Sequence, residues 1–280
     1  MAVSNRKFSL PEGLSPVMPT RPVAGYIGGK RNLARRLVER IAATPHTTYA
    51  EVFVGMGGVF FRRTARPQAE VINDWSRDVA TLFRVLQRLY VPFMDILRWQ
   101  LTTRTRFEEL LRTDPTTLLD IERAARFLYL QRTAFGGKVV GRGFGVSPST
   151  PARFDITKLG PLLEAAHERL SSVVIERLPW SQFISRYDRP GTLFYLDPPY
   201  YGCERDYGDD AGQPLFSREE FEQMAEQLAS IEGRFILSLN DHPDVRTIFA
   251  GFAIEEVETV YQIGGMDRAK RVGELIIMPP

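Results

Sequence analysis

The sequence is poor in the residues that build metal centres and disulfide frameworks. Among 280 residues it has one cysteine, Cys203, and three histidines, His46, His167 and His242. A single cysteine cannot form an internal disulfide or a thiolate zinc cluster, and it points to a reducing cytoplasmic compartment. The histidines show no pairing at metal-ligand spacing, so we expect no metal site. We interpret Cys203 as an incidental loop thiol.

Long apolar runs and a strong charge imbalance are also lacking. No uninterrupted apolar segment approaches the roughly 20 residues that a membrane helix needs, and we expect no membrane association. Residues 1–20 lack the apolar centre of a secretion signal and are expected to be a flexible lead-in. The formal net charge is only +2. Hydrophobic residues make up 44% and charged residues 25% of the chain, which excludes disordered, collagen-like and coiled-coil proteins.

Strand-like apolar runs alternate with helical stretches before residue 90 and after residue 170. This alternation predicts an α/β fold with a parallel sheet and crossover helices. Strands are expected at residues 49–54, 70–73, 173–176, 192–196, 234–239, 254–260 and 274–278. Helices are expected at residues 30–43, 59–64, 74–89, 217–231 and 243–249.

The strand signals stop in the middle of the chain. Helices are expected at residues 93–111 and 121–135, followed by a turn-rich hairpin or loop at 136–151. The sequence therefore predicts a main domain formed by residues 21–90 and 170–280, with an inserted lobe at 91–169.

Basic residues are concentrated in this lobe. From Arg123 to Arg153 there are six basic residues and no acidic one. A solvated helix face followed by a loop would give this pattern. A surface that meets nucleic-acid phosphates would give it equally, because basic side chains displace the counterions of phosphates. The distribution of charge alone leaves both alternatives open.

A glycine-rich segment, residues 51–58 (EVFVGMGG), spans the end of the first predicted strand and the start of the turn that follows it. Glycines at a strand-to-helix junction let the backbone approach a ligand closely. Asp74 ends the next strand 19 residues after Gly55, near the roughly 20-residue offset of nucleotide-binding folds. A structural turn, or a site for a nicotinamide or flavin cofactor, fits the same pattern.

A second glycine cluster, residues 25–30 (GYIGGK), precedes the first predicted helix. A Walker P-loop would need glycine where Ala24 stands and a hydroxyl residue where Arg31 stands, so that interpretation fails. Tyr26 and Lys30 remain at a helix N-terminus, where they could bind a carboxylate. An ordinary helix-start turn is the structural alternative.

The tetrapeptide Asp197-Pro198-Pro199-Tyr200 closes the apolar run at residues 192–196. Two successive prolines stop a strand or helix, which creates a rigid bend between a carboxylate and an aromatic ring. The exocyclic amino nitrogen of a purine is a poor nucleophile because its lone pair is delocalised into the ring. A carboxylate and an aromatic ring at one bend could bind such an amine and localise that lone pair. Asp197 and the Pro198 carbonyl can accept its two hydrogens while Tyr200 stacks on the ring, which contributes about 1–3 kcal/mol per base. A strand-ending turn with two prolines is the structural alternative.

Together these motifs resemble the Dam-type N6-adenine DNA methyltransferases. The resemblance runs from about residue 26 to residue 280, in the family's order of cofactor motif, target-recognition lobe and catalytic motif. The similar segments are residues 26–30, 51–60, 72–74, 127–132, 197–200 and 267–275.

The resemblance implies a class I S-adenosylmethionine-dependent methyltransferase (Rossmann-like) sheet with an inserted, mainly helical target-recognition lobe that carries a hairpin. The catalytic residues that it implies are Asp197, Pro198, Pro199 and Tyr200. The implied cofactor-binding residues are Tyr26, Lys30, Glu51, Phe53, Gly55, Gly57, Asp74, Trp180 and Asp197. The implied phosphate-binding residues are Arg126, Arg132, Lys138, Arg142 and Arg153.

The expected activity is transfer of a methyl group from S-adenosyl-L-methionine to N6 of an adenine flipped out of double-stranded DNA. Gln131 stands where the family often has Asn, and the hairpin lacks the usual base-reading side chains, so we assign no recognition sequence. An N-methyltransferase acting on RNA or a protein amide and a non-catalytic DNA-binding relative are the alternatives. The oligomeric state is open between a monomer and a weak dimer. The loop at residues 201–216 fits closure over the base and an inert surface excursion equally.

Overall fold

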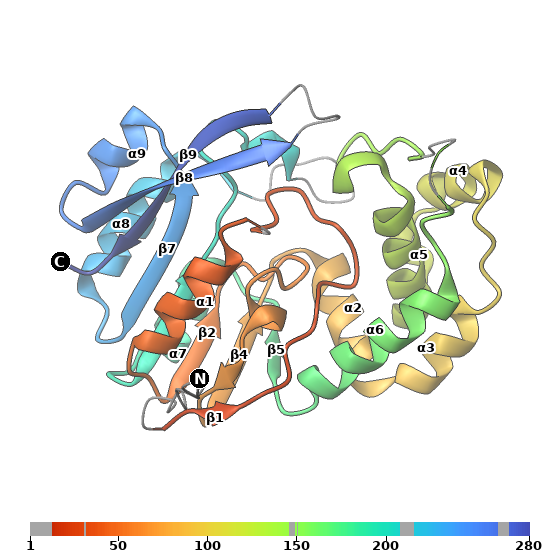
Figure 1. Ribbon diagram of the computed structural model, residues 1–280, viewed down its shortest axis with the longest axis horizontal. Helices are drawn as coiled ribbons and strands as arrows, with labels where there is room; N and C mark the ends of the chain where they lie inside the picture. The colour runs from red at the N-terminus through yellow and green to blue at the C-terminus, as the bar shows by residue number, and fades with distance from the viewer. Residues whose placement is uncertain (1–12, 31, 146–148, 150, 208–215, 263–268) are drawn as a thin grey trace, which may run out of the picture.

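A mostly parallel sheet forms the centre of the protein (Figure 1). The structure is a computed structural model that describes residues 13–30, 32–145, 149, 151–207, 216–262 and 269–280. Within these residues, seven strands lie in the order β5-β4-β2-β6-β7-β9-β8. Their bounds are β2 (Thr48–Glu51), β4 (Ala69–Asn73), β5 (Val174–Glu176), β6 (Thr192–Leu196), β7 (Arg234–Asn240), β8 (Ala253–Gln262) and β9 (Ala269–Met278).

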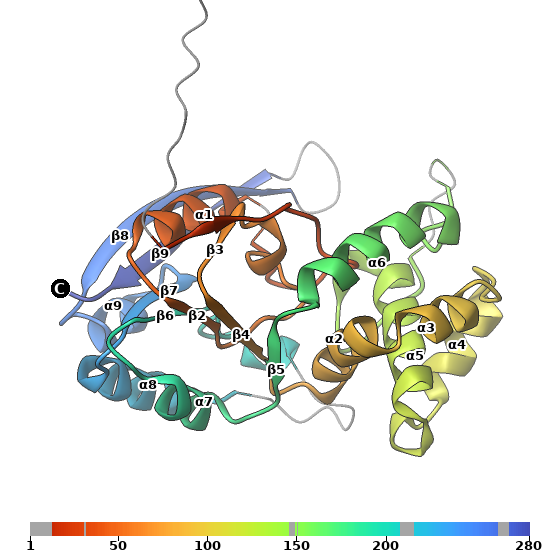
Figure 2. The same ribbon diagram turned by 90° about the horizontal axis from the view of Figure 1, so that it is seen from below.

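The first five strands of this order are parallel, whereas β9 runs antiparallel to both β7 and β8. Helices cover both faces of the sheet (Figure 2). On one face lies α1 (Ala34–Ala43), near a short antiparallel pair formed by β1 (Ser15–Pro16) and β3 (Ala65–Arg66). On the other lie α7 (Trp180–Tyr187), α8 (Glu219–Ser230) and α9 (Pro243–Ile248). The predicted α/β class is confirmed.

The burial of strand β6 explains its largely apolar sequence. All residues of TLFYL are buried, because helices cover both faces of the sheet and leave neither to solvent. Successive side chains enter opposite layers: Leu193 and Tyr195 belong to one apolar core and Phe194 and Leu196 to the other. The strand therefore holds the bend that follows it in a rigid setting.

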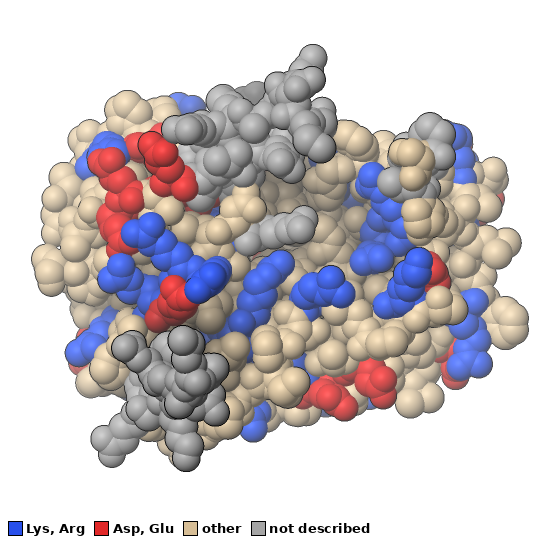
Figure 3. Space-filling view, in the orientation of Figure 1, with Lys and Arg blue, Asp and Glu red and all other residues tan. Residues whose placement is uncertain are grey.

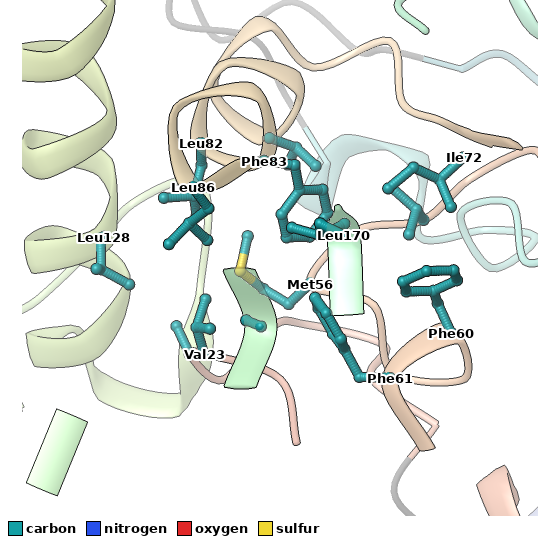
Figure 4. Packing of buried hydrophobic residues seen from close by; sticks show 14 of the residues in the cluster. Val23, Met56, Phe60, Phe61, Ile72, Leu82, Phe83, Leu86, Leu128 and Leu170 are labelled. Carbon is teal, nitrogen blue, oxygen red and sulfur yellow. The ribbon is translucent and has the colours of Figure 1, made fainter. Parts of the chain in front are cut away.

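Helices gather beside the sheet in a lobe on the right of Figure 1. They are α2 (Arg77–Arg88), α3 (Tyr90–Leu97), α4 (Arg104–Arg112), α5 (Asp120–Thr133) and α6 (Ile156–Leu170). Figure 4 shows side chains of α2, such as Leu86, pointing toward Leu128 of α5 and toward Met56 beside the sheet. Lobe and sheet thus share one apolar core, although the domain bounds drawn from the sequence place α2 with the main domain.

Several element predictions were wrong. The single helix expected at 93–111 is two helices, because α3 ends at Leu97 and Thr103 caps a new helix by accepting a hydrogen bond from the Arg106 backbone. The helix expected at 59–64 is only the 3-10 turn η1 (Phe60–Arg62). Helices α6 and α7 were not predicted.

The expected hairpin at 136–151 is represented by little regular structure. Among its described residues, the regular features are the short turn η3 (Phe135–Gly137), which begins one residue before it, and Phe144, which forms an isolated bridge with Ala134. Residues 146–148 and 150 lie outside the described residues, as do 208–215 of the loop at 201–216 and 267–268 of the basic C-terminal segment.

Candidate active site

A cavity of about 660 Å³ lies at the carboxyl ends of β2, β4 and β6. Ligands of open α/β sheets bind at this edge, and the volume lies within the range of about 300–1,000 Å³ of small-molecule sites. Of the predicted catalytic and cofactor-binding residues, those that line it are Tyr26, Lys30, Glu51, Phe53, Gly55, Asp74, Asp197 and Pro199. The glycine turn after β2 and the Asp-Pro bend after β6, far apart in the chain, therefore meet at one cavity.

The turn after β2 is tied to the end of β4. The Gly55 N–H donates to Asp74 Oδ2 at 2.8 Å, and the Ser76 N–H donates to Asp74 Oδ1 at 2.9 Å. Gly55 has a φ of +50°, and a Cβ there would lie 3.1 Å from the ring of Tyr26. Burial raises the pKa of Asp74 to about 6, against the two backbone hydrogen bonds, which lower it. The Asp74 carboxylate and the Tyr26 ring thus both lie against Gly55 in the wall of the cavity.

Gly57 and Trp180 are absent from the cavity wall. A Cβ at Gly57, whose φ is +72°, would lie 2.4 Å from the Phe61 ring, so this glycine serves close packing. Trp180 is 7% exposed, and its indole N–H donates to Glu220 at 2.8 Å. The structure does not bring either residue to the site that the sequence assigned to it.

Glu51 ends β2 as a buried carboxyl in the cavity wall. Its Oε2 accepts a hydrogen bond from the Tyr49 hydroxyl at 2.5 Å. Burial raises the pKa of Glu51 to about 8, although the hydrogen bond from Tyr49 and the charge of Arg63 both lower it. Glu51 is therefore mainly protonated at neutral pH.

Asp197, at the end of β6, is held by a buried cation. Its Oδ1 lies 2.6 Å from Lys30 Nζ and accepts a longer hydrogen bond, 3.3 Å, from Ser238 of β7. The Ser238 hydroxyl in turn lies 2.9 Å from that of Tyr195. Burial raises the pKa of Asp197 to about 6, and the ammonium of Lys30 opposes that rise. The carboxylate is charged at neutral pH and oriented by two donors.

Tyr200 lies behind Asp197 and is not part of the cavity wall, nor is Pro198. The Tyr200 hydroxyl accepts a hydrogen bond from Lys30 at 3.0 Å and donates one to Glu274 at 2.7 Å. Sequence reasoning missed Glu274 and Ser238, because neither belongs to a local motif of the bend. Only the antiparallel register of β9 on β7, which pairs Glu274 with Asn240, brings Glu274 there.

The basic stripe of the lobe divides into an internal and an external part. Arg123 and Arg126 are buried: Arg123 pairs with Asp78 at 2.6 Å, and Arg126 donates to the Leu110 carbonyl at 2.8 Å. Arg126, expected at phosphates, therefore stabilises the interior of the lobe. Lys138 and Arg153 are exposed, and Arg142 is half-buried.

Basic side chains also reach the cavity itself. Arg132 lines it and donates to the backbone carbonyls of Val23 and Arg153. Three further cations that the sequence did not single out, Arg21, Arg62 and Lys158, line the same cavity. Figure 3 shows Lys and Arg side chains gathered along the margin of the hollow in this face. The surroundings of the cavity are thus suited to an anionic ligand.

Within the part of the chain that the structure describes, no helix combines the length and apolar character needed to cross a membrane. Among the same residues, no group of three or more His, Cys, Asp and Glu side chains could hold a metal ion.

Comparison with known proteins gives a family match and distant relatives. A family model for the D12 class N6 adenine-specific DNA methyltransferases matches residues 26–263. The Type II methyltransferase M.CviBI of Paramecium bursaria Chlorella virus NC1A is 21% identical over 250 residues, covering 86% of this chain and 91% of that protein. The Type II methyltransferase M1.LlaDCHI of Lactococcus lactis subsp. cremoris is 22% identical over 271 residues, covering 92% and 94%.

A solved structure from Pyrococcus horikoshii, of a protein proposed to be an RNA methyltransferase, overlaps with a TM-score of 0.38 at 8% identity. The overlap covers 93% of this chain and 91% of that one. A likeness of this size carries no argument about substrate.

Proposed function

Because this chain belongs to the D12 class N6 adenine-specific DNA methyltransferases, we propose that it moves a methyl group from S-adenosylmethionine to N6 of an adenine flipped out of duplex DNA. Its reaction is DNA adenine methylation. The observation that supports the detailed proposal is the meeting of Asp197 with Tyr26 and Gly55 at one cavity. The bend that begins at Asp197, which binds the amine in this proposal, and the glycine turn at Gly55 lie in the wall of the same cavity.

The residues of the cavity fit S-adenosylmethionine. Asp74 lies where the ribose hydroxyls of a nucleotide are bound in such sheets. The neighbouring Trp75 is 40% exposed at the cavity and offers a flat face to an adenine ring. Tyr26 covers the space beside Gly55, and Arg21 and Arg62 offer positive charge to a carboxylate. When bound, the cofactor supplies a methyl group on a positively charged sulfur.

The bend after β6 makes adenine N6 reactive. The amino nitrogen is a poor nucleophile because its lone pair is delocalised into the ring. Asp197 and the Pro198 carbonyl accept its two hydrogens, which localises the lone pair, and Tyr200 stacks on the base. Asp197, ionised above about pH 6, then takes the proton that N6 releases. Most of the rate acceleration comes from holding the amine in near-attack geometry.

The inserted lobe, residues 91–169, positions the DNA. The target base must leave the duplex, because N6 cannot be reached while the base is stacked. Arg132, Lys138, Arg142 and Arg153 contact phosphates, and such contacts fix the position of the duplex without reading its sequence. A DNA substrate and a single cysteine together favour a reducing cytoplasmic compartment.

A product analysis tests this proposal. The enzyme and tritiated S-adenosylmethionine are incubated in three separate reactions, with unmethylated duplex DNA, with RNA or with a mixture of proteins. The DNA is then digested to nucleosides and separated. We expect label in N6-methyldeoxyadenosine. Label confined to RNA or protein, or to another position of the DNA bases, would overturn the proposal, as would the absence of any transfer.

A further inference from the structure

A buried carboxylate of β9 lies beside the Asp-Pro-Pro-Tyr bend. Glu274 is 0% exposed. Its Oε1 accepts a hydrogen bond from the Tyr200 hydroxyl at 2.7 Å, and its Oε2 lies 4.0 Å from the ammonium of Lys30. Burying a charge is costly, and a well-packed apolar residue often stabilises a fold as well as a buried ion pair does. The burial of Glu274 beside Lys30 is therefore weak evidence for a stabilising role, and its contacts with the bend point to a role in the site.

Lys30 links Glu274 to Asp197. Its ammonium is 2.6 Å from Asp197 Oδ1 and 3.0 Å from the Tyr200 hydroxyl, and it lies 4.3 Å from the centre of the Tyr200 ring. The Lys30 side chain is 1% exposed, whereas that of Asp197 is 19% exposed. The cation thus lies behind the carboxylate. Since Lys30 and Ser238 both bind Oδ1, Oδ2 is the oxygen that remains for a substrate amine.

We propose that Glu274 is a positioning residue for methyl transfer, which fixes Lys30 and Tyr200 from behind so that Asp197 Oδ2 and the Tyr200 ring face the base. This inference rests on the proposed function. The negative charge of Glu274 balances Lys30, so the ammonium is shared and does not neutralise Asp197 alone. The hydrogen bond to Glu274 also fixes the Tyr200 ring, because its hydroxyl is held at the far end.

The groups that face Asp197 give this inference a characteristic signature. They are Lys30 ahead of α1, Glu51 of β2, Tyr195 of β6, Ser238 of β7 and Glu274 of β9, together with Tyr200 of the bend itself. After burial, which raises the pKa of Asp197 to about 6, Lys30 lowers it and Glu274 raises it. Removing the charge of Glu274 and removing that of Lys30 therefore shift this pKa in opposite directions.

The test measures kcat for transfer of tritiated methyl groups to unmethylated plasmid DNA between about pH 5 and pH 9. Saturating cofactor keeps the titration of Asp74 out of kcat. In Glu274→Gln we expect kcat to fall by about 10- to 100-fold at its plateau, because misplaced reacting groups lose that much. Its acidic limb should move to lower pH, whereas Lys30→Gln should move the limb to higher pH.

The matched control is Glu256→Gln, on the neighbouring strand β8, where the side chain is 67% exposed and pairs with Arg246. It should keep the wild-type kcat and pH profile. Calorimetric titration with S-adenosylmethionine should give Glu274→Gln a Kd within about twofold of wild type, since Glu274 does not line the cavity.

A Glu274→Gln enzyme that keeps more than half of the wild-type kcat, or whose acidic limb stays in place or rises, would overturn the positioning role. Should that variant not fold, Tyr200→Phe removes the same hydrogen bond but keeps the ring. The inference then requires Tyr200→Phe to lose kcat with cofactor affinity unchanged, and an unchanged kcat would refute it. A wild-type enzyme that transfers nothing to adenine N6 refutes the proposed function itself, which separates the two failures.

Discussion

Carboxyl groups at the ends of β2, β4 and β6 meet at one cavity but are stabilised differently. Asp74 is held by two backbone N–H groups, Asp197 by the ammonium of Lys30, and Glu51 by the Tyr49 hydroxyl. Burial raises the pKa of Asp74 and Asp197 to about 6 and that of Glu51 to about 8. At pH 7 the first two are therefore mainly charged and the third mainly neutral, so three carboxyl groups at one cavity differ in charge because their surroundings differ.

Substitution of Asp197 by asparagine should remove methyl transfer. Asp197→Asn keeps the shape of the side chain but loses the charge that draws the hydrogens of the base amine, and removing one such electrostatic group costs about 10²–10³-fold in kcat. The Kd of S-adenosylmethionine, measured by calorimetric titration, should change by less than about threefold. Turnover within a factor of two of wild type would contradict the proposed role of Asp197.

Glu51 should make the stability of the protein depend on pH. Its pKa is raised from 4.5 to about 8 in the folded state, so between these values the folded protein binds more protons than the unfolded chain. The free energy of unfolding that Glu51 contributes is therefore fully present below about pH 4.5 and is lost as the pH rises through 8.

The variant Glu51→Gln stays neutral and should lose this dependence. Urea unfolding at several pH values should show the stability difference between variant and wild type shifting in favour of the variant as the pH rises from about 5 to 9. A difference that stays constant over this range would show that Glu51 does not bind a proton in the folded state.

At the scale of elements, the sequence predicts best where one local signal dominates. The bounds of β6 were predicted as observed, because a central parallel strand reads as an uninterrupted apolar run. The break between α3 and α4 was missed although Thr103 is a typical N-cap residue. Helix α6 was missed although Asp155 caps it, because Pro161 inside it reads as a break.

The same distinction applies to the site. Asp197, Gly55 and Tyr26 each lie in a short motif that can be recognised from the sequence alone, and the structure places all three in the wall of one cavity. Glu274 could not be found, because it joins the site only through the pairing of β9 with β7. Arg126 was misplaced because a basic residue on a helix gives no sign of the face on which it lies. Tertiary packing decided that it donates to the Leu110 carbonyl inside the lobe.

The turn between β2 and η1 depends on a glycine. In Gly55→Ala the alanine would have to adopt a φ of +50°, which L residues rarely do. Its Cβ would also lie 3.1 Å from the Tyr26 ring. We expect the free energy of unfolding to fall by about 1 kcal/mol, the usual cost of a left-handed alanine. The Kd of S-adenosylmethionine should rise by about 10-fold, as misfit in a close contact commonly costs about 1–2 kcal/mol.

Gly13→Ala is the matched control for this variant. Gly13 has a φ of +86°, but a Cβ there would meet no atom within 4 Å among the described residues, and Gly13 does not line the cavity. The control should therefore cost similar stability, measured by urea unfolding, and leave cofactor affinity unchanged. Equal cofactor affinity in both variants would show that the space beside Gly55 is not used for binding.

Over the whole molecule, the distribution of charge matters more than its sum. The net charge of +2 is small, yet basic side chains gather along the hollowed face (Figure 3). Arg132 and Lys158 reach this hollow from the lobe, and Arg21 and Arg62 reach it from the sheet side. A duplex lying along this face would contact both parts of the molecule at once.

The affinity for DNA should therefore fall steeply as the salt concentration rises. Single basic residues of the lobe should each contribute a measurable part of this dependence. Each phosphate contact contributes about 0.9 to the slope of log K against log salt concentration. Lys138→Ala and Arg153→Ala should each lower that slope by about 1, as measured by fluorescence anisotropy of a labelled duplex at several salt concentrations. Arg35→Ala on α1, where the side chain is 91% exposed and pairs with Glu39, removes the same charge away from the cavity and should leave the slope unchanged. If Arg35→Ala lowered the slope as much as Lys138→Ala does, binding would follow net charge alone, and the lobe would not be the DNA-binding surface.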